Sequence, residues 1–269
     1  MLAEERVKQW FAAYENGAAI AFSGGVDSTF LLACAHEVLG DRVIAYTAVS
    51  DFFPKWEQSD AREMAARIGA RHEWLQLDVL SVPEIAQNGP RRCYHCKKRI
   101  FSAILEQAKI QGINTLCDGS NEDDKGDYRP GMQGAKELGT RSPLLELGLG
   151  KAEIRAASAR MHLPTAQKPA YACLATRIPT GEPVSREKLA RIDRAEAYLH
   201  EQGFLAVRVR CHGAIARIEV ATQELARFCK EADFAGISDA LKATGFQFVT
   251  LDLSGYKTGS MNAPQGEQA

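Results

Sequence analysis

Short apolar runs alternate with segments of helical periodicity through the first half of the chain. The runs predict strands at residues 18–22, 43–49, 72–77 and 113–117. Between them, apolar residues recur at three- and four-residue intervals, which predicts helices at residues 28–39, 56–68 and 97–110. Strands that alternate with helices form a parallel sheet with helices on both faces. We therefore predict an α/β fold whose ligands bind at the carboxyl ends of the strands.

The second half of the chain predicts a different unit. Residues 121–150 are irregular and rich in glycine, proline and charge, and residues 168–184 carry three prolines. Helices are predicted at residues 151–161, 186–202 and 223–229, and strands at residues 205–210, 214–220 and 246–253. We predict an α/β domain (1–165), a linker and cysteine loop (166–184), a smaller α+β domain for substrate binding or oligomerisation (185–262) and a disordered tail (263–269).

The composition is that of an ordinary soluble globular protein, with 45% hydrophobic and 25% charged residues in a chain of 269. A formal net charge of −1 and a pI of about 6.6 provide no global basic field that would recruit nucleic acid. The N-terminus lacks the pattern of a signal peptide, and no apolar run is long enough to cross a bilayer. We therefore expect a soluble cytoplasmic protein that binds neither nucleic acid nor membranes.

A glycine-rich loop, Ser23-Gly24-Gly25-Val26-Asp27-Ser28, follows the first predicted strand and opens the first predicted helix. The two glycines permit close backbone approach, and the start of a helix presents N–H groups and a positive dipole end to an anion. A carboxylate beside phosphates needs a cation between them, so Asp27 predicts Mg²⁺ on the leaving pyrophosphate of ATP. The loop lacks the lysine of a Walker motif, which disfavours phosphoryl transfer of that kind. A turn capped by serine and aspartate is the structural alternative.

This loop resembles the Ser-Gly-Gly-x-Asp-Ser motif of the PP-loop ATP pyrophosphatases. Enzymes of that superfamily cleave ATP between its α- and β-phosphates and adenylate an oxygen of a carboxylate, amide or carbonyl group. The resemblance implies that Ser50, Gly119 and Ser120 flank the adenosine and that Asp123 or Asp124 assists the metal.

Seven cysteines, an odd number, argue against a disulfide framework. Four lie within apolar helix or strand patterns and are interpreted as small buried residues: Cys34, Cys117, Cys211 and Cys229. Cys93 and Cys96 lie instead among arginine, histidine and lysine residues, and Cys173 lies on the predicted loop between Lys168 and Arg177. Positive charge lowers the pKa of a thiol and favours the thiolate, which binds metals or attacks carbon.

Further motifs narrow the resemblance to the ATP-dependent sacrificial sulfur transferases of the LarE family, which make the nickel-pincer cofactor of lactate racemase. The motifs cover almost the whole chain: Ser23 to Ser28, Arg92-Cys93-Tyr94-x-Cys96-Lys97, Asp118-Gly119-Ser120-Asn121-x-Asp123-Asp124, Asp127-Tyr128-Arg129-Pro130-Gly131, Arg141-Ser142-Pro143-Leu144, Ala172-Cys173-Leu174-Ala175-x-Arg177 and Leu251-Asp252-Leu253-x-Gly255-Tyr256.

Enzymes of this family activate a carboxylate of pyridinium-3,5-dicarboxylate mononucleotide as an acyl-adenylate. Sulfur then displaces AMP and leaves a thiocarboxylate. In the sacrificial version a cysteine, with which Cys173 aligns, gives up its own sulfur and becomes dehydroalanine. The resemblance also implies a homo-oligomer.

The pair of Cys93 and Cys96 departs from the single-cysteine version. Together with Cys173, the pair can hold a [4Fe-4S] cluster by three irons and leave the fourth iron open to a hydrosulfide. In that version Cys173 is a ligand and survives turnover. Zinc binding by the same thiols, an inert reduced pair and a sacrificial Cys173 are the alternatives.

Arg208 and Arg210 alternate on a predicted strand and so point to one face, where two guanidiniums suit a phosphate. The resemblance places the nucleotide phosphate of the substrate there, with Glu196 and Glu219 as neighbours that bind metal or orient the arginines. A solvated face with surface ion pairs is the alternative, and Arg217 fits either interpretation.

Two other functions remain open at this point. A tRNA thiolase has the same fold and can hold a cluster with similar cysteines, but the near-neutral pI and the absence of terminal Cys-x-x-Cys pairs count against it. A nucleotide sensor would bind ATP without cleaving it, so pyrophosphate release separates it from an enzyme.

Overall fold

The computed structural model describes residues 1–126, 130–169 and 171–256, and the chain divides into two compact units. Unit 1 consists of Met1–Val79 and Cys93–Tyr171, whereas unit 2 consists of Leu80–Arg92 and the chain from Ala172 onward. The four-part division predicted above stays a prediction, and it differs from these units in the assignment of residues 80–92. Its tail, residues 263–269, lies outside the described residues.

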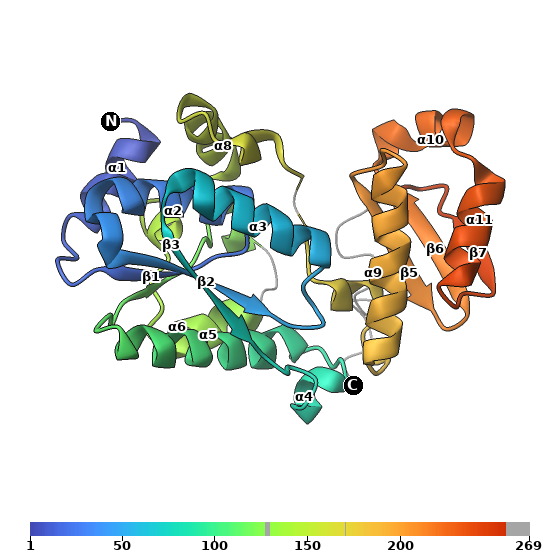
Figure 1. The fold of residues 1–269 in the computed structure, drawn as a ribbon, viewed down its shortest axis with the longest axis horizontal. Helices are drawn as coiled ribbons and strands as arrows, with labels where there is room; N and C mark the ends of the chain where they lie inside the picture. The colour runs from blue at the N-terminus through green and yellow to red at the C-terminus, as the bar shows by residue number, and fades with distance from the viewer. Residues whose placement is uncertain (127–129, 170, 257–269) are drawn as a thin grey trace. The chain divides into compact units, whose positions relative to one another are not determined.

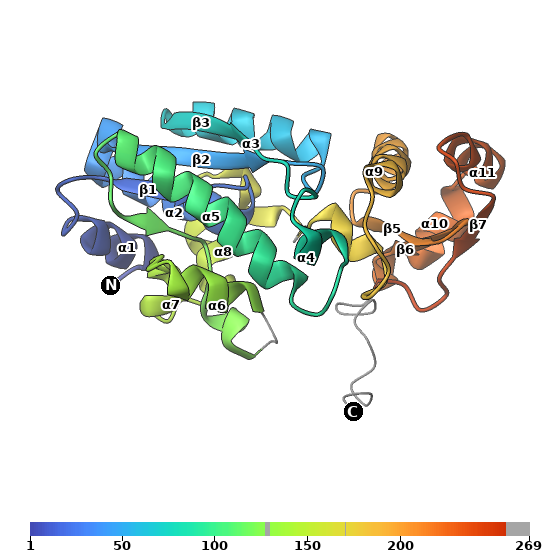
Figure 2. The ribbon, with the colours of Figure 1, turned by 90° about the horizontal axis from the view of Figure 1, so that it is seen from below.

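A four-stranded parallel sheet forms the centre of unit 1, in the order β3–β2–β1–β4 (Figures 1 and 2). Its strands are β1 (Ala18–Ala21), β2 (Val43–Val49), β3 (Arg71–Gln76) and β4 (Leu116–Cys117). The chain runs from β1 outward to β3 and then returns to the other side of β1 for β4. An open α/β sheet binds its ligands at such a reversal, here at the ends of β1 and β4.

Helices cover both faces of this sheet, as Figure 1 shows. One face packs against α1 (Ala3–Phe11), α2 (Val26–Leu39), α3 (Lys55–Ile68) and α8 (Lys151–Arg160). The other packs against α5 (Arg92–Ile110) and α6 (Pro130–Glu137). The short elements of unit 1 are η1 (Gly40–Arg42), η2 (Glu122–Gly126), α7 (Pro143–Glu146) and η3 (Pro164–Gln167).

Unit 2 is built on a mixed three-stranded sheet in the order β5–β6–β7. β5 (Val207–His212) is antiparallel to β6 (Ile215–Val220), and β7 (Phe248–Leu251) is parallel to β6. The other elements are α4 (Pro83–Ala86), η4 (Leu174–Arg177), α9 (Arg186–Glu201), η5 (Thr222–Glu224), α10 (Leu225–Glu231) and α11 (Phe234–Ala243). The predicted fold class, an α/β domain with a smaller α+β unit, is confirmed. None of the described helices is both long and apolar enough to span a membrane.

Residues 80–92 are fixed to unit 2 by a buried amide side chain. Asn88 is 1% exposed, and its Nδ2 donates to the carbonyl oxygens of Pro179 at 2.8 Å and Glu182 at 3.0 Å. Its own carbonyl accepts from the N–H of Gly181 at 2.9 Å. These bonds join two segments that lie about ninety residues apart in the chain.

Several elements differ from the prediction. α5 begins at Arg92 rather than residue 97, because the polar first turn carries no apolar period that would have marked it. β4 is only two residues long, since the N–H of Ile113 bonds to Ala108 at the end of α5 instead of joining the sheet. The helices α1, α4, α6, α7 and α11 were not predicted at all.

Candidate active site

The glycine-rich loop lies at the sheet reversal, between the end of β1 and α2. Gly24 has a φ of +71°, and a Cβ added there would lie 2.8 Å from the Cα of Ala61. The hydroxyl oxygens of Ser23 and Ser28 lie 3.2 Å apart, and the N–H of Gly25 donates to Ser23 Oγ at 3.4 Å. No side chain in the described part of the chain caps α2 at Gly25, so the N–H groups of its first turn can bind an anion.

We expect Gly24→Ala to destabilise unit 1 by roughly 3 kcal/mol, because it combines a left-handed backbone angle with a clash against backbone. The matched control is Gly139→Ala, where φ is +70° but no atom lies within 4 Å of the added Cβ. Urea unfolding of both variants separates the two contributions. Equal losses in both variants would show that the contact with Ala61 is unimportant.

The segment after β4 packs directly against this loop. A Cβ on Gly119 would lie 3.1 Å from the backbone nitrogen of Ser28, which places Gly119 and Ser120 beside the start of α2. Asp118 accepts hydrogen bonds from Lys97 Nζ at 2.7 Å, Ser142 Oγ at 2.7 Å and Ser120 Oγ at 2.9 Å. Burial would raise the pKa of Asp118, but these partners outweigh it and hold that pKa below its usual range.

Ser50 occupies the turn that follows β2, at the same end of the sheet. Its hydroxyl oxygen accepts a hydrogen bond from the N–H of Phe52 at 3.3 Å. The serine therefore shapes a turn, and its contact with adenosine stays a proposal.

Asp27 has one paired and one unpaired carboxylate oxygen. Its Oδ2 accepts from Lys151 Nζ at 2.7 Å, whereas Oδ1 is buried and has no hydrogen-bond partner among the residues that the structure describes. Burial raises the pKa of Asp27, an effect that Lys151 opposes and the charge of Asp124 reinforces. A buried carboxylate oxygen without a donor fits a divalent cation such as Mg²⁺. Within the described ranges, no three His, Cys, Asp or Glu side chains already form a metal-binding group.

The two aspartates expected to assist the metal are engaged in local bonds. Asp123 Oδ2 accepts from the backbone nitrogen of Lys151 at 2.7 Å and so holds the start of α8. Asp124 Oδ2 accepts from the backbone nitrogen of Asn121 at 3.0 Å.

A half-buried histidine supports the strand that leads into the glycine-rich loop. Thr47 Oγ1 donates to the carbonyl of Phe22 at 2.7 Å, so it accepts from His72 Nε2 at 2.8 Å. Burial, with a smaller contribution from Arg62, lowers the pKa of His72 to about 4.

This histidine predicts a loss of stability in acid. His72 is protonated near pH 6.5 in the unfolded chain but only near pH 4 in the folded protein. The contribution of neutral His72 to the free energy of unfolding is therefore fully present above pH 6.5 and is lost as the pH falls from 6.5 to about 4. Because the ring is partly exposed, we expect the free energy of unfolding to fall by about 1–2 kcal/mol, which is less than the full shift of the His72 pKa implies. Melting temperatures of the wild type and His72→Gln between pH 7.5 and 4.5 test this. Identical pH profiles would contradict it.

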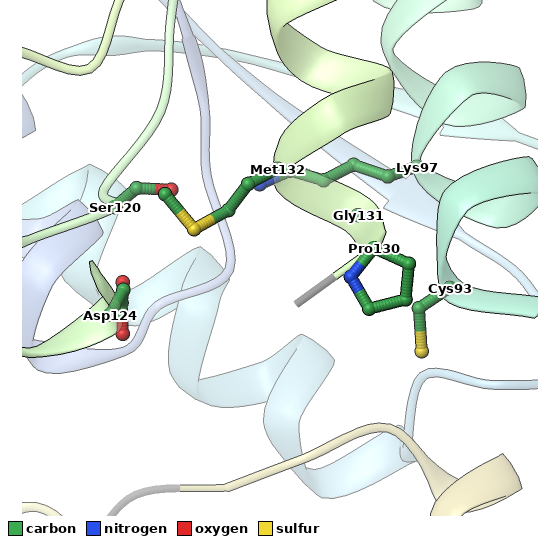
Figure 3. Close-up of a pocket in the computed structure, with 7 residues that line it drawn as sticks. All are labelled: Cys93, Lys97, Ser120, Asp124, Pro130, Gly131 and Met132. Carbon is green, nitrogen blue, oxygen red and sulfur yellow. The ribbon is translucent and has the colours of Figure 1, made fainter. Parts of the chain in front are cut away.

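Cys93 and Cys96 lie on the first turn of α5, where Cys93 is exposed and Cys96 is half-buried. Cys93 lines a pocket of about 220 Å³ within unit 1 (Figure 3). Figure 3 shows Ser120 and Asp124 on one side of this pocket and Cys93 on the other, with Lys97 and Met132 between them. The pocket therefore connects the predicted nucleotide site with one predicted thiol ligand. Residues 127–129, the first three of the predicted motif at 127–131, lie outside the described residues.

Cys173, in unit 2, is the N-cap residue of η4 and is half-buried. The surrounding carbonyls are held by arginines. Arg177 Nη1 donates to the carbonyls of Ala172 at 2.6 Å and Cys173 at 3.2 Å. Arg92 Nη1 donates to the carbonyl of Ala175 at 3.0 Å, and Arg210 Nη1 donates to the carbonyl of Thr176 at 2.9 Å. The backbone of the cysteine loop is thus fixed by cationic side chains.

A buried ion pair holds Arg177 in turn. Glu196 Oε1 accepts from Arg177 Nε at 2.9 Å, and Oε2 accepts from Nη2 at 3.0 Å. Both side chains are 0% exposed, and Oε1 also accepts from the N–H of Val209. Glu196 therefore orients Arg177, while its predicted role beside Arg208 and Arg210 stays a prediction.

Arg208 and Arg210 lie on the same face of β5, because both guanidiniums pack against the ring of Tyr256. Their central carbons lie 5.2 Å and 5.8 Å from the centre of that ring. Glu219 accepts from Arg210 and from Arg217 at 2.9 Å each. The alternative of a solvated face is wrong for the two arginines, because each is only 4% exposed.

Four cationic residues that contact either the glycine-rich loop or the cysteine loop were not recognised as functional from the sequence: Arg92, Lys151, Lys168 and Arg177. Their partners are remote in the chain; Lys151 and Asp27, for example, are 124 residues apart. Lys168 and Arg177 carried a signal through their places near Cys173, and Arg92 through its place beside Cys93, whereas Lys151 carried none.

Comparison with known proteins agrees with this geometry. The asparagine synthase family matches residues 16–103, which contain the glycine-rich loop. An uncharacterised protein of Synechocystis sp. is 42% identical over 96% of both chains. The pyridinium-3,5-bisthiocarboxylic acid mononucleotide synthase of Lactiplantibacillus plantarum is 37% identical over 90% of this chain and 88% of that one. An uncharacterised protein of Methanocaldococcus jannaschii is 28% identical over 89% and 90%.

The fold and the loop define a PP-loop enzyme of the ATP pyrophosphatase superfamily. Within it, the chain belongs to the LarE family, that of the pyridinium-3,5-bisthiocarboxylic acid mononucleotide synthases. The family resemblance seen in the sequence is confirmed, whereas the iron–sulfur version of it stays a proposal.

Proposed function

We propose that this protein is an ATP-dependent sulfur transferase that acts on pyridinium-3,5-dicarboxylate mononucleotide in nickel-pincer cofactor biosynthesis. The observation that supports this most is the 37% identity to the Lactiplantibacillus plantarum synthase, which extends across both units. The glycine-rich loop and the held cysteine loop supply the two chemistries that such a reaction needs.

The first chemistry is adenylation. A carboxylate oxygen of the substrate attacks the α-phosphorus of ATP, the bond from that phosphorus to the α,β-bridging oxygen breaks, and pyrophosphate leaves. The start of α2 and the hydroxyls of Ser23 and Ser28 bind the phosphates, while Gly119 and Ser120 border the nucleotide. Asp27 would hold Mg²⁺, which supplies positive charge against the pyrophosphate. Arg208 and Arg210 would bind the phosphate of the substrate.

The second chemistry is transfer of sulfur to the acyl carbon with loss of AMP. Cys93, Cys96 and Cys173 would hold a [4Fe-4S] cluster, whose open iron supplies a site for an added hydrosulfide. The positions of Cys93 and Cys96 on one helical turn, with exposed or half-buried thiols, suit this role better than that of inert core residues. A sacrificial Cys173 is the second candidate, favoured by its alignment within the family.

Pyrophosphate release tests the proposed function. The anaerobically purified protein, given ATP, Mg²⁺, sulfide and pyridinium-3,5-dicarboxylate mononucleotide, should release pyrophosphate and AMP and form a thiocarboxylate. No release in the presence of the substrate would exclude the proposal and favour a nucleotide sensor. Release that depends on tRNA instead would favour the thiolase.

A further inference from the structure

The segment of unit 2 that precedes α5 is joined to the cysteine loop by backbone hydrogen bonds. The N–H of Val184 donates to the carbonyl of Ala86 at 2.8 Å, and the N–H of Gly181 donates to the carbonyl of Asn88 at 2.9 Å. A step of two residues forward on one segment is thus matched by a step of three residues backward on the other. The two segments run in opposite directions, so the first approaches α5 as the second approaches Cys173.

The side chain of Asn88 strengthens this pairing and also orients an arginine. Its Nδ2 donates to the carbonyls of Pro179 and Glu182, as described above, while its Oδ1 accepts a hydrogen bond from Arg92 Nη1. The φ of Asn88 is +57°, in the left-handed region that asparagine tolerates better than most residues. Both the backbone angle and the amide group of Asn88 therefore suit this position.

Arg92 continues the same series of bonds toward the cysteine. The residue is only 8% exposed, and its Nη1 donates to the carbonyl of Ala175 at 3.0 Å. Ala175 lies two residues after Cys173, and Arg92 immediately precedes Cys93 in the sequence. Because the two segments run in opposite directions, the next positions along this course are Cys93 on one segment and Cys173 on the other.

We propose that Arg92 is a positioning residue that holds Cys173 where its thiol can share one metal ion or cluster with Cys93 and Cys96. Those two thiols already lie on the first turn of α5, and the cysteine loop supplies the third. Thiolates bind zinc and iron–sulfur clusters, and residues that orient metal ligands tune how tightly the metal is held. Asn88 acts one step further out, because it fixes the guanidinium of Arg92. The assignment rests on the proposed function, in which the same thiols hold the cluster.

The test uses Zn²⁺ in excess with the full-length reduced protein, in the absence of ATP and substrate. Alkylation of each cysteine by iodoacetamide is followed by mass spectrometry. In the wild type, we expect Zn²⁺ to protect Cys93, Cys96 and Cys173 together. In Zn²⁺-loaded Arg92→Met, Cys173 should be alkylated roughly 10–100-fold faster than in the wild type, as for loss of a residue that orients a metal ligand.

Neighbouring residues provide matched controls. Arg91→Met removes an exposed arginine directly before Arg92 and should keep Cys173 protected, which separates loss of the buried contact from loss of charge near the thiols. Cys211 is buried in unit 2, so its alkylation would reveal unfolding rather than release of the loop. Asn88→Gly is a second variant, because glycine accepts a φ of +57° while the amide group is lost, and it should also release Cys173.

Rapid alkylation of Cys173 in the Zn²⁺-loaded wild type would overturn the assignment, whether or not the variants fold. Equal protection of Cys173 in the wild type and in either variant that keeps Cys211 unreactive would overturn it as well. A wild type that shows the expected protection, lost in Arg92→Met, but forms no thiocarboxylate from ATP, sulfide and the pyridinium substrate would refute the proposed reaction and leave this assignment standing.

Discussion

Replacement of Cys173 by alanine is expected to leave pyrophosphate release intact and to lower thiocarboxylate formation by at least 1000-fold, as for loss of a nucleophile or of its metal site. Attack of a substrate carboxylate on the α-phosphorus of ATP uses no thiol, so adenylation should proceed without Cys173. Both products are measured in one assay by chromatography. Cys229→Ala is the control and should be active, because Cys229 lies exposed in α10 of unit 2, which corrects its interpretation from the sequence as a buried residue.

Intact mass after one turnover then distinguishes the two origins of the sulfur. A wild-type protein that becomes lighter by one H₂S has formed dehydroalanine: thiolate attack expels AMP, a proton leaves Cα, and the Cβ–S bond breaks. An unchanged mass together with bound iron supports the cluster. Normal thiocarboxylate formation by Cys173→Ala would contradict both the sacrificial cysteine and the cluster that Cys173 would help to hold.

Glu196→Gln is expected to destabilise unit 2 by about 3–5 kcal/mol, because it leaves the buried Arg177 guanidinium without its counter-charge. The exposed pair of Arg227 and Glu224 in the same unit provides the control, and Glu224→Gln should cost less than about 1 kcal/mol. Thermal unfolding measures both. A loss for Glu196→Gln as small as that of the control would show that the pair is unimportant.

A double replacement keeps this test informative if the single variant fails to fold. Arg177→Met with Glu196→Met removes both charges together and should be more stable than Glu196→Gln. Sulfur transfer should remain low in the double variant, since the carbonyls of Ala172 and Cys173 have lost their donor, while pyrophosphate release persists. If the double variant transferred sulfur normally, the Arg177–Glu196 ion pair would not be needed to position the cysteine loop.

Local patterns were enough to predict the strands and most helices of unit 1. β2 was predicted to the residue, because five of its seven positions are buried apolar or small side chains in a continuous run. α1 and α11 had amphipathic patterns, with Val7 and Phe11 or Ile237 and Leu241 spaced by four, which were overlooked. The start of α5 had no such pattern, so it was placed five residues too late.

The candidate site was predictable only where one short segment carries the chemistry. The residues of the glycine-rich loop are contiguous, and their order is informative by itself. Lys151 and Lys168 acquire meaning only through contacts with Asp27 and Gly24, and no periodicity records such pairs. Glu196 was recognised as a candidate, but its partner is Arg177, which the sequence linked only to the cysteine.

The attachment of residues 80–92 to unit 2 has a consequence for synthesis of the protein. As the chain emerges from the ribosome, Asn88 must wait until residues 179–182 have appeared before its buried side chain can find its acceptors. Unit 1 is therefore interrupted by a segment whose polar groups are temporarily unpaired. A fragment that begins at residue 172 would lack that segment for good, so unit 2 is not expected to fold when expressed by itself.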